Sequence, residues 1–141
     1  MNAFAALLAE KADESWHIDP KDNDRRSELA RQMAVLRDAR IVCPGVDIIA
    51  IPNAGKSSDW ERIRRWKEGA RAGALDLVAT WKGGVAFIEM KDGKKMPAQD
   101  QRGRLNMYTR MGHHCGVFRQ EKSVMDFLRR CGAPFIDRPA L

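Results

Sequence analysis

Two apolar runs around a short glycine-containing connection most strongly constrain the fold of this chain. Residues 75–81 and 85–91 are rich in aliphatic and β-branched side chains, and Lys82-Gly83-Gly84 separates them. This pattern predicts an antiparallel β-hairpin. A loop of two or four residues places Asp76 directly opposite Glu89, whereas a loop of three residues shifts the register by one and turns Asp76 to the other face.

The register with Asp76 opposite Glu89 gathers charged side chains on one face of the hairpin. Directly opposed residues have Cβ atoms about 4.5–5.5 Å apart, so the two carboxylates would repel each other. Strand alternation adds Lys91 to this face and turns Ile88 and Met90 to the other. A divalent cation between the two acids would offset their repulsion. The alternative is a solvated sheet face with an ordinary ion pair between Glu89 and Lys91.

The segments at the start of the chain predict an N-terminal arm and a first core helix. Residues 3–11 are rich in Ala and Leu and predict a short helix, whereas the polar residues 13–24 predict a linker. The core helix is predicted to begin near Asp24 as its N-cap, with Glu28 at the border of its buried face. Three apolar residues are predicted to occupy that face: Leu29, Met33 and Leu36.

The middle of the chain predicts a strand followed by a short basic helix. Residues 46–51 are aliphatic and β-branched and predict a strand buried on both faces. Ser58 or Asp59 can cap the helix that follows. Trp60 and Trp66 lie six residues apart, so we expect one to be buried and the other to be free for a partner.

The end of the chain predicts a helix, a strand and a last helix. Pro97 can occupy the first position of a helix that ends at Gly112. A strand at 115–118 and a helix from Ser123 follow. A hairpin and then a helical crossover to another strand imply an α/β fold with a mixed sheet. The apolar stripe of the first of these helices is predicted to hold Leu105, Tyr108 and Met111.

Composition and charge limit the classes of protein to consider. The 141 residues are 44% hydrophobic and 31% charged, which is typical of one globular domain. No apolar stretch is long enough to span a bilayer, and three cysteines without a CxxC spacing favour free thiols, so we expect a soluble intracellular protein. The net charge of +6 favours a polyanionic partner. The Asn-Ala-Gly-Lys-Ser run lacks the spacing of a phosphate-binding loop, so we expect no nucleotide cofactor.

Four short segments form an ordered set of motifs. They are Ile51-Pro52-Asn53-Ala54-Gly55, Gly73-Ala74-Leu75-Asp76-Leu77, Phe87-Ile88-Glu89-Met90-Lys91 and the helix start from Gln99 to Gln101. This set, from about Glu28 to Phe135, resembles the VRR-NUC domain of the PD-(D/E)xK nuclease superfamily, in particular its small stand-alone members from phages and bacteria. The resemblance implies a restriction-endonuclease-like core of about four strands flanked by helices in residues 24–141, preceded by the arm and linker of residues 1–23. It also implies a cytoplasmic location in a bacterial or phage-infected cell.

The resemblance also implies roles for individual residues. Asp76 and Glu89 match the metal ligands of the superfamily, with the Met90 carbonyl as a further ligand, and Lys91 matches the catalytic lysine. Glu28 resembles the glutamate that the first helix often brings to the metal. One of two residues matches the family's glutamine: the distance back from Gly112 favours Gln101, and proximity to Pro97 favours Gln99. The departure is Leu75, where the family usually has proline.

Oxygen ligands of this kind suit Mg²⁺, with Mn²⁺ as a substitute, rather than zinc. The expected activity is metal-dependent hydrolysis of phosphodiester bonds in DNA, and the family implies a branched substrate such as a Holliday junction and a homodimer that makes paired incisions. The alternatives are a restriction-like or repair nuclease on linear or flap DNA, and a basic DNA-binding protein without catalysis. The residues predicted to contact DNA are Asn53, Lys56, Arg62, Arg64, Arg65, Lys67, Arg71, Lys94 and Lys95.

Overall fold

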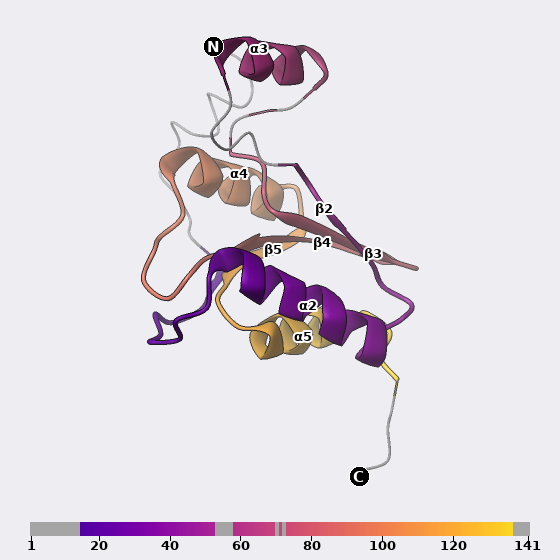
Figure 1. Ribbon diagram of the computed structural model, residues 1–141. Coiled ribbons are helices and arrows are strands. Elements are labelled where there is room, and N and C mark those ends of the chain that lie inside the picture. Colours follow the sequence, from indigo (N-terminus) through magenta and orange to yellow (C-terminus); the bar gives the residue numbers. More distant parts are fainter. Residues whose placement is uncertain (1–14, 53–57, 70, 72, 137–141) are drawn as a thin grey trace.

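The computed structural model describes residues 15–52, 58–69, 71 and 73–136, which form an α/β fold around a mixed sheet (Figure 1). The strands are β1 His17–Ile18, β2 Asp47–Ala50, β3 Leu77–Trp81, β4 Gly84–Met90 and β5 His114–Phe118. The helices are α2 Glu28–Val42, α3 Asp59–Lys67, α4 Gln99–Arg110 and α5 Glu121–Arg130. The α/β class is as predicted, and in the described part of the chain the sheet has five strands rather than about four.

The strand order is β1-β5-β4-β3-β2. Strands β2, β3 and β4 are antiparallel, and β4, β5 and β1 are parallel to one another. The α4 helix provides the crossover between β4 and β5. The predicted combination of an antiparallel hairpin and a helical crossover is therefore confirmed.

The hairpin between β3 and β4 has the predicted register. Trp81 pairs with Gly84 across a two-residue turn, and Leu77 pairs with Ile88 at the other end of the ladder. Gly83 has a φ of +96°, a backbone conformation that favours glycine and suits this short turn. The same register continues to Asp76 and Glu89, one position beyond the last ladder pair.

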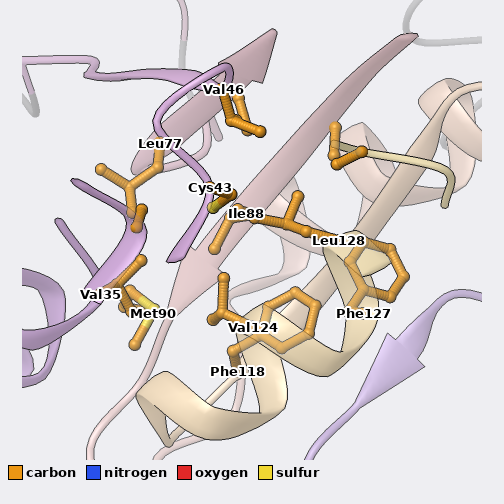
Figure 2. Packing of buried hydrophobic residues seen from close by; sticks show 14 residues of the cluster. Val35, Cys43, Val46, Leu77, Ile88, Met90, Phe118, Val124, Phe127 and Leu128 are labelled. Atoms are coloured by element: carbon orange, nitrogen blue, oxygen red, sulfur yellow. The ribbon is translucent and has the colours of Figure 1, made fainter. Parts of the chain in front are cut away.

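Helices cover both faces of the sheet. Figure 1 shows α2 and α5 on one side and α4 on the other. On the α2 and α5 side, Leu77, Ile88 and Met90 pack among Val35 and Leu128 (Figure 2). Side-chain alternation therefore turns Glu89 toward α4, where the second core cluster consists of Trp16, Leu75, Leu105, Cys115 and Val117.

The predicted linker over residues 13–24 contains a short strand in its described part, and residues 19–24 form no helix or strand. His17–Ile18 pairs with β5 as strand β1, while Trp16 and Asp19 are buried. The Trp16 indole N–H donates to Asn106 Oδ1 on α4 at 2.8 Å, so a distant part of the chain holds this segment in place. The helix predicted over residues 3–11 lies outside the described residues, and the boundary between residues 23 and 24 stays a prediction.

The first core helix begins later and buries a different face than predicted. Ser27, rather than Asp24, is the N-cap, and its side chain accepts a hydrogen bond from the amide of Ala30 at 3.1 Å. Asp24 instead accepts hydrogen bonds from Arg26. The small residues on the buried face allow α2 to lie close to the sheet and α5. That face holds Arg31, Ala34, Val35 and Ala39, whereas Leu29 and Met33 are exposed and Leu36 is half-buried.

Other details of the middle elements also differ from the predictions. The strand predicted to be buried on both faces is β2, an edge strand with exposed Ile49 and Ala50, because it pairs only with β3. Trp60 and Trp66 are both exposed, so the expectation of one buried tryptophan is wrong.

The helices toward the end of the chain begin at other residues than predicted. Ala98 is the N-cap of α4, so Pro97 lies before the helix instead of at its first position. The last helix, α5, starts at Glu121, two residues before Ser123. Met111 of the predicted stripe is exposed. Within the described ranges, no helix is both long and apolar enough to cross a membrane.

Candidate active site

The carboxylates of Asp76 and Glu89 bridge two neighbouring segments of the hairpin. The backbone N–H of Asp76 donates to Glu89 Oε2 at 3.2 Å, and the N–H of Met90 donates to Asp76 Oδ2 at 2.9 Å. Each acid thus accepts a bond from the backbone of the opposite segment. Glu89 is only 1% exposed, and Asp76 is half-buried. The predicted convergence of the two acids is present in the structure.

Gln101 is the glutamine that reaches the acidic pair. Its Nε2 donates to Glu89 Oε1 at 2.7 Å, and its Oε1 accepts the amide of Ala98 at 2.9 Å. Ala98 has no polar side chain to cap α4, so Gln101 satisfies one amide at the helix start and orients Glu89 at the same time. Gln99 is exposed at the first position of the helix, and no contact joins it to the acids.

Gly73 allows α4 to approach the segment that leads to Asp76. Gly73 has a φ of +76°, and a Cβ atom placed there would lie 2.4 Å from the carbonyl oxygen of Asp100. Any side chain would therefore push α4 away. The start of α4 and the residues before β3 are in contact only because this position is glycine, and Gln101 reaches Glu89 as a result.

Lys91 and Glu28 complete the cluster. The Lys91 ammonium nitrogen lies 3.3 Å from Glu89 Oε1 and 3.8 Å from Glu28 Oε1. Glu28 stands at the first position of α2, which brings it to the site from the opposite layer. Its Oε1 is buried and has no hydrogen-bond partner in the described chain.

Burial and mutual repulsion disfavour the charged forms of the two acids. Burial, followed by the Asp76 carboxylate, raises the pKa of Glu89 to about 8. Burial and the charge of Glu28 also raise the pKa of Asp76, against the hydrogen bond from Met90. Lys91 lowers both pKa values, but too little to offset these effects. Burial is thus the main reason why the charged forms are disfavoured, and the one nearby ammonium does not compensate for it.

The donor atoms suit a hard divalent cation. Mg²⁺ commonly takes one or two carboxylates from a protein and completes its shell with water and substrate phosphate oxygens. Asp76 and Glu89 supply such a pair, and Glu28 Oε1, which has no hydrogen-bond partner in the described chain, lies 3.8 Å from the Lys91 ammonium. In the residues that the structure describes, no group of three or more His, Cys, Asp and Glu side chains is placed to hold a metal ion by itself. A metal here would thus depend on non-protein ligands, and the role of the Met90 carbonyl stays a prediction.

The residues predicted to contact DNA fall into three sets. Lys94 and Lys95 are exposed on the segment between Lys91 and α4. Asn53 and Lys56 lie outside the described residues. No residue of α3 is buried. The remaining five lie on α3 or follow it: Arg62, Arg64, Arg65, Lys67 and Arg71.

Arg119 is a supporting residue that the sequence did not reveal. It is fully buried after β5, and its guanidinium donates to the carbonyls of Asp92 and Lys95, the latter at 2.8 Å. Its own amide donates to Asp19 at 2.7 Å. Arg119 thus fixes the segment that connects Lys91 to α4. Its partners are far away in sequence, so no local pattern indicates this role.

No family model, curated protein or solved structure matches this chain. The resemblance to the VRR-NUC domain therefore rests on the motif residues themselves. The structure brings Glu28, Asp76, Glu89, Lys91 and Gln101 together. The function of that cluster is inferred from its chemistry.

Proposed function

We propose that this protein is a divalent-metal-dependent endonuclease that hydrolyses phosphodiester bonds in DNA, on a core of the PD-(D/E)xK type. One observation carries the proposal: two acids with raised pKa values share one face of a hairpin, with an ammonium 3.3 Å from one of them. A structural ion cluster normally favours the charged forms of its acids. Here burial and mutual repulsion disfavour the charged forms, a cost that a bound cation would offset, and an oxygen-rich site suits Mg²⁺ or Mn²⁺.

Each side chain has a distinct task in the proposed reaction. Asp76 and Glu89 would hold the metal, which would supply Lewis-acid polarisation of the scissile phosphate and lower the pKa of a water. The Met90 amide and Gln101 fix the orientations of Asp76 and Glu89. The Lys91 ammonium orients the attacking water and offsets the negative charge that develops on the phosphate.

DNA binding follows from the exposed basic residues. Lys94 and Lys95 flank the site along the chain, and α3 adds further cations. Contacts of this kind to phosphates weaken steeply as salt rises and carry no sequence preference. The resemblance extends the proposal to a branched substrate and a homodimer, because a twofold dimer makes paired incisions naturally.

Cleavage of defined DNA structures tests the proposal. End-labelled four-way junction, flap and linear duplex are incubated with the wild type in Mg²⁺, Mn²⁺ or EDTA. We expect metal-dependent cleavage that Asp76→Asn abolishes and Asp126→Asn retains, because Asp126 is an exposed acid on α5 away from the site. The substrate that is cut fastest separates a junction enzyme from a flap or duplex enzyme. The proposal fails if the wild type cuts none of them with either metal, or if Asp76→Asn cuts as fast as the wild type.

A further inference from the structure

Helix α3 exposes an apolar stripe that nothing in the described chain covers. Trp60, Ile63 and Trp66 are 68%, 55% and 59% exposed, and they follow one another at intervals of three residues. Ile63 therefore lies between the two indoles on the helix surface. A nine-residue helix is marginal by itself in water, and exposed indoles leave a large apolar area unburied. Binding of a partner would bury this apolar area.

A guanidinium group lies over one face of each indole ring, so each ring has its other face for a base. The Arg64 guanidinium carbon is 5.8 Å from the centroid of the Trp60 ring, and that of Arg71 is 4.8 Å from the centroid of Trp66. Arg71 is also anchored by a 2.8 Å hydrogen bond to the Trp66 carbonyl. Residues 58–71 contain five basic and three acidic side chains. The partner should therefore be an anion that also presents flat apolar surfaces.

One hollow along α3 combines both properties. It has a volume of about 300 Å³ and is lined by Trp60, Ile63, Arg64, Lys67 and Glu68. Glu68 is paired with Arg64 at 3.2 Å, so its charge is offset within the helix. The hollow thus has aromatic and aliphatic walls, with Lys67 at its edge.

We propose that α3 binds an unpaired segment of the nucleic acid by stacking its bases on Trp60 and Trp66, with the neighbouring arginines on the phosphates. Bases in a duplex are already stacked on each other, so only unpaired bases offer a free face to an indole. Aromatic side chains interleaved with basic ones are the usual means of holding single strands without sequence preference. An acidic peptide would satisfy the cations but would leave the indoles without a matching partner.

Helix α3 lies on the side of the sheet that carries the candidate active site. Figure 1 shows α3 on the same side of the sheet as α4, whose Gln101 contacts Glu89. A strand held on α3 is therefore on the side of the sheet toward which Glu89 points. This inference rests on the proposed nuclease function and adds to it a substrate with unpaired bases near the cleaved bond.

Tryptophan fluorescence tests the stacking directly. Full-length Asp76→Asn protein, which leaves the DNA uncut, is titrated in EDTA with oligothymidylate and with an abasic oligonucleotide of equal length. We expect oligothymidylate to quench the fluorescence and to bind more tightly than the abasic strand, by roughly 5- to 150-fold for each stacked base. The other two tryptophans are Trp16, which is buried, and Trp81, which is half-buried in β3, so quenching that persists without Trp60 and Trp66 comes from these two.

Variants separate base stacking from phosphate contact. The combination of Trp60→Leu and Trp66→Leu should remove the preference for oligothymidylate and leave abasic binding unchanged, with the melting temperature intact because α3 buries no residue. Lys67→Ala should weaken both strands equally. Equal binding of the two strands by the Asp76→Asn protein overturns the inference, as does a double variant that keeps the preference. The inference is also overturned if the fluorescence of Trp60 and Trp66 changes only with anionic vesicles, or if a second copy of the chain covers the stripe.

The two proposals fail separately. If the Asp76→Asn protein binds the two strands equally while the wild type shows metal-dependent cleavage, only the stacking inference fails. Stacking without metal-dependent cleavage of any DNA ends only the nuclease proposal.

Discussion

Two charged clusters in this molecule are removed from water, and their surroundings shift the pKa values of their acids in opposite directions. Arg31 is 0% exposed, and its guanidinium donates to Asp22 at 2.9 and 3.0 Å and to the carbonyl of Arg119 at 2.7 Å. The hydrogen bond from Arg31 lowers the pKa of Asp22 to about 2. At the hairpin, burial and repulsion raise the pKa of both Asp76 and Glu89. The surroundings of Asp22 thus favour its ionised form, whereas those of Asp76 and Glu89 disfavour theirs.

This difference is the one expected between a structural ion cluster and the active site proposed above. The Arg31 cluster joins the segment before α2 to the residue after β5 and needs no further partner. The Asp76 and Glu89 pair has one ammonium beside it and still favours protonation. Buried charges that are incompletely offset are costly for folding and common at functional sites. Variants of the two clusters can therefore break or sharpen the contrast between them.

The largest expected effect is the loss of cleavage rate in the Lys91→Met variant. The variant keeps the length of the side chain and removes the ammonium, so we expect the single-turnover cleavage rate to fall about 10²- to 10⁴-fold, with little change in DNA affinity. Quenched-flow cleavage and fluorescence anisotropy measure the two quantities. Lys95→Met is the matched control: Lys95 is exposed, so its loss should weaken binding in a salt-dependent way and leave the rate of the bound complex unchanged. The reverse pattern would place the chemistry elsewhere.

Arg31→Met should produce the largest loss of stability. It removes the cation from the Asp22 carboxylate, which then accepts, within the described residues, only from Gln120 and the Asp24 amide. It also removes the guanidinium donor from the carbonyl oxygens of Asp24 and Arg119, and we expect a total cost of about 3–5 kcal/mol. Urea unfolding in EDTA measures this loss. The control is Arg37→Met, an exposed residue of the same helix paired with Asp38, for which we expect a change within about 1 kcal/mol. An Arg31→Met protein as stable as the control would contradict the structural role.

Asp76→Asn should have the opposite effect on stability in the absence of metal. Because the pKa of Glu89 rises from 4.5 to about 8 on folding, the folded protein keeps a proton that the unfolded chain has lost between these pH values. Stability should therefore fall as pH rises through this window. Asn removes the neighbouring charge, so we expect a gain of about 1–2 kcal/mol at pH 8 and a shallower pH slope in EDTA.

Mg²⁺ provides the control for this prediction. It should raise the melting temperature of the wild type at pH 8 and have a smaller effect on Asp76→Asn, since a ligand that binds the folded state stabilises it. For Asp22 the pH dependence of stability has the opposite sign. Its lowered pKa contributes stability above pH 3.8, and this contribution is lost as pH falls toward 2. A wild type whose stability rises between pH 5 and pH 8 in EDTA would contradict the assignment of the raised pKa to Glu89.

What the sequence predicts depends on how local the determining contacts are. The hairpin is local, so the sequence limits it to two registers, and the two-residue turn in the structure selects the one with Asp76 opposite Glu89. The burial of Arg31 could not be predicted, because its partner at residue 119 lies 88 residues away. The apolar spacing of Leu29 and Met33 predicts the wrong buried face for α2, since the structure exposes both. The β1 strand escapes prediction for the same reason as Arg31, because it is two residues long and pairs with distant β5.

The smallest expected effect tests which glutamine, Gln99 or Gln101, positions Glu89. The start of α4 decides between them, because Ala98 as the N-cap turns Gln101 back toward the acids. Gln101→Ala removes the donor to Glu89 and the acceptor for the Ala98 amide, so we expect a loss of about 1–2 kcal/mol in urea unfolding and a lower affinity for Mg²⁺. Gln99 is exposed, so Gln99→Ala should change stability by less than about 0.5 kcal/mol. Equal effects of the two variants on metal affinity would show that the contact with Glu89 does not position that carboxylate, and the site would then depend on the hairpin alone.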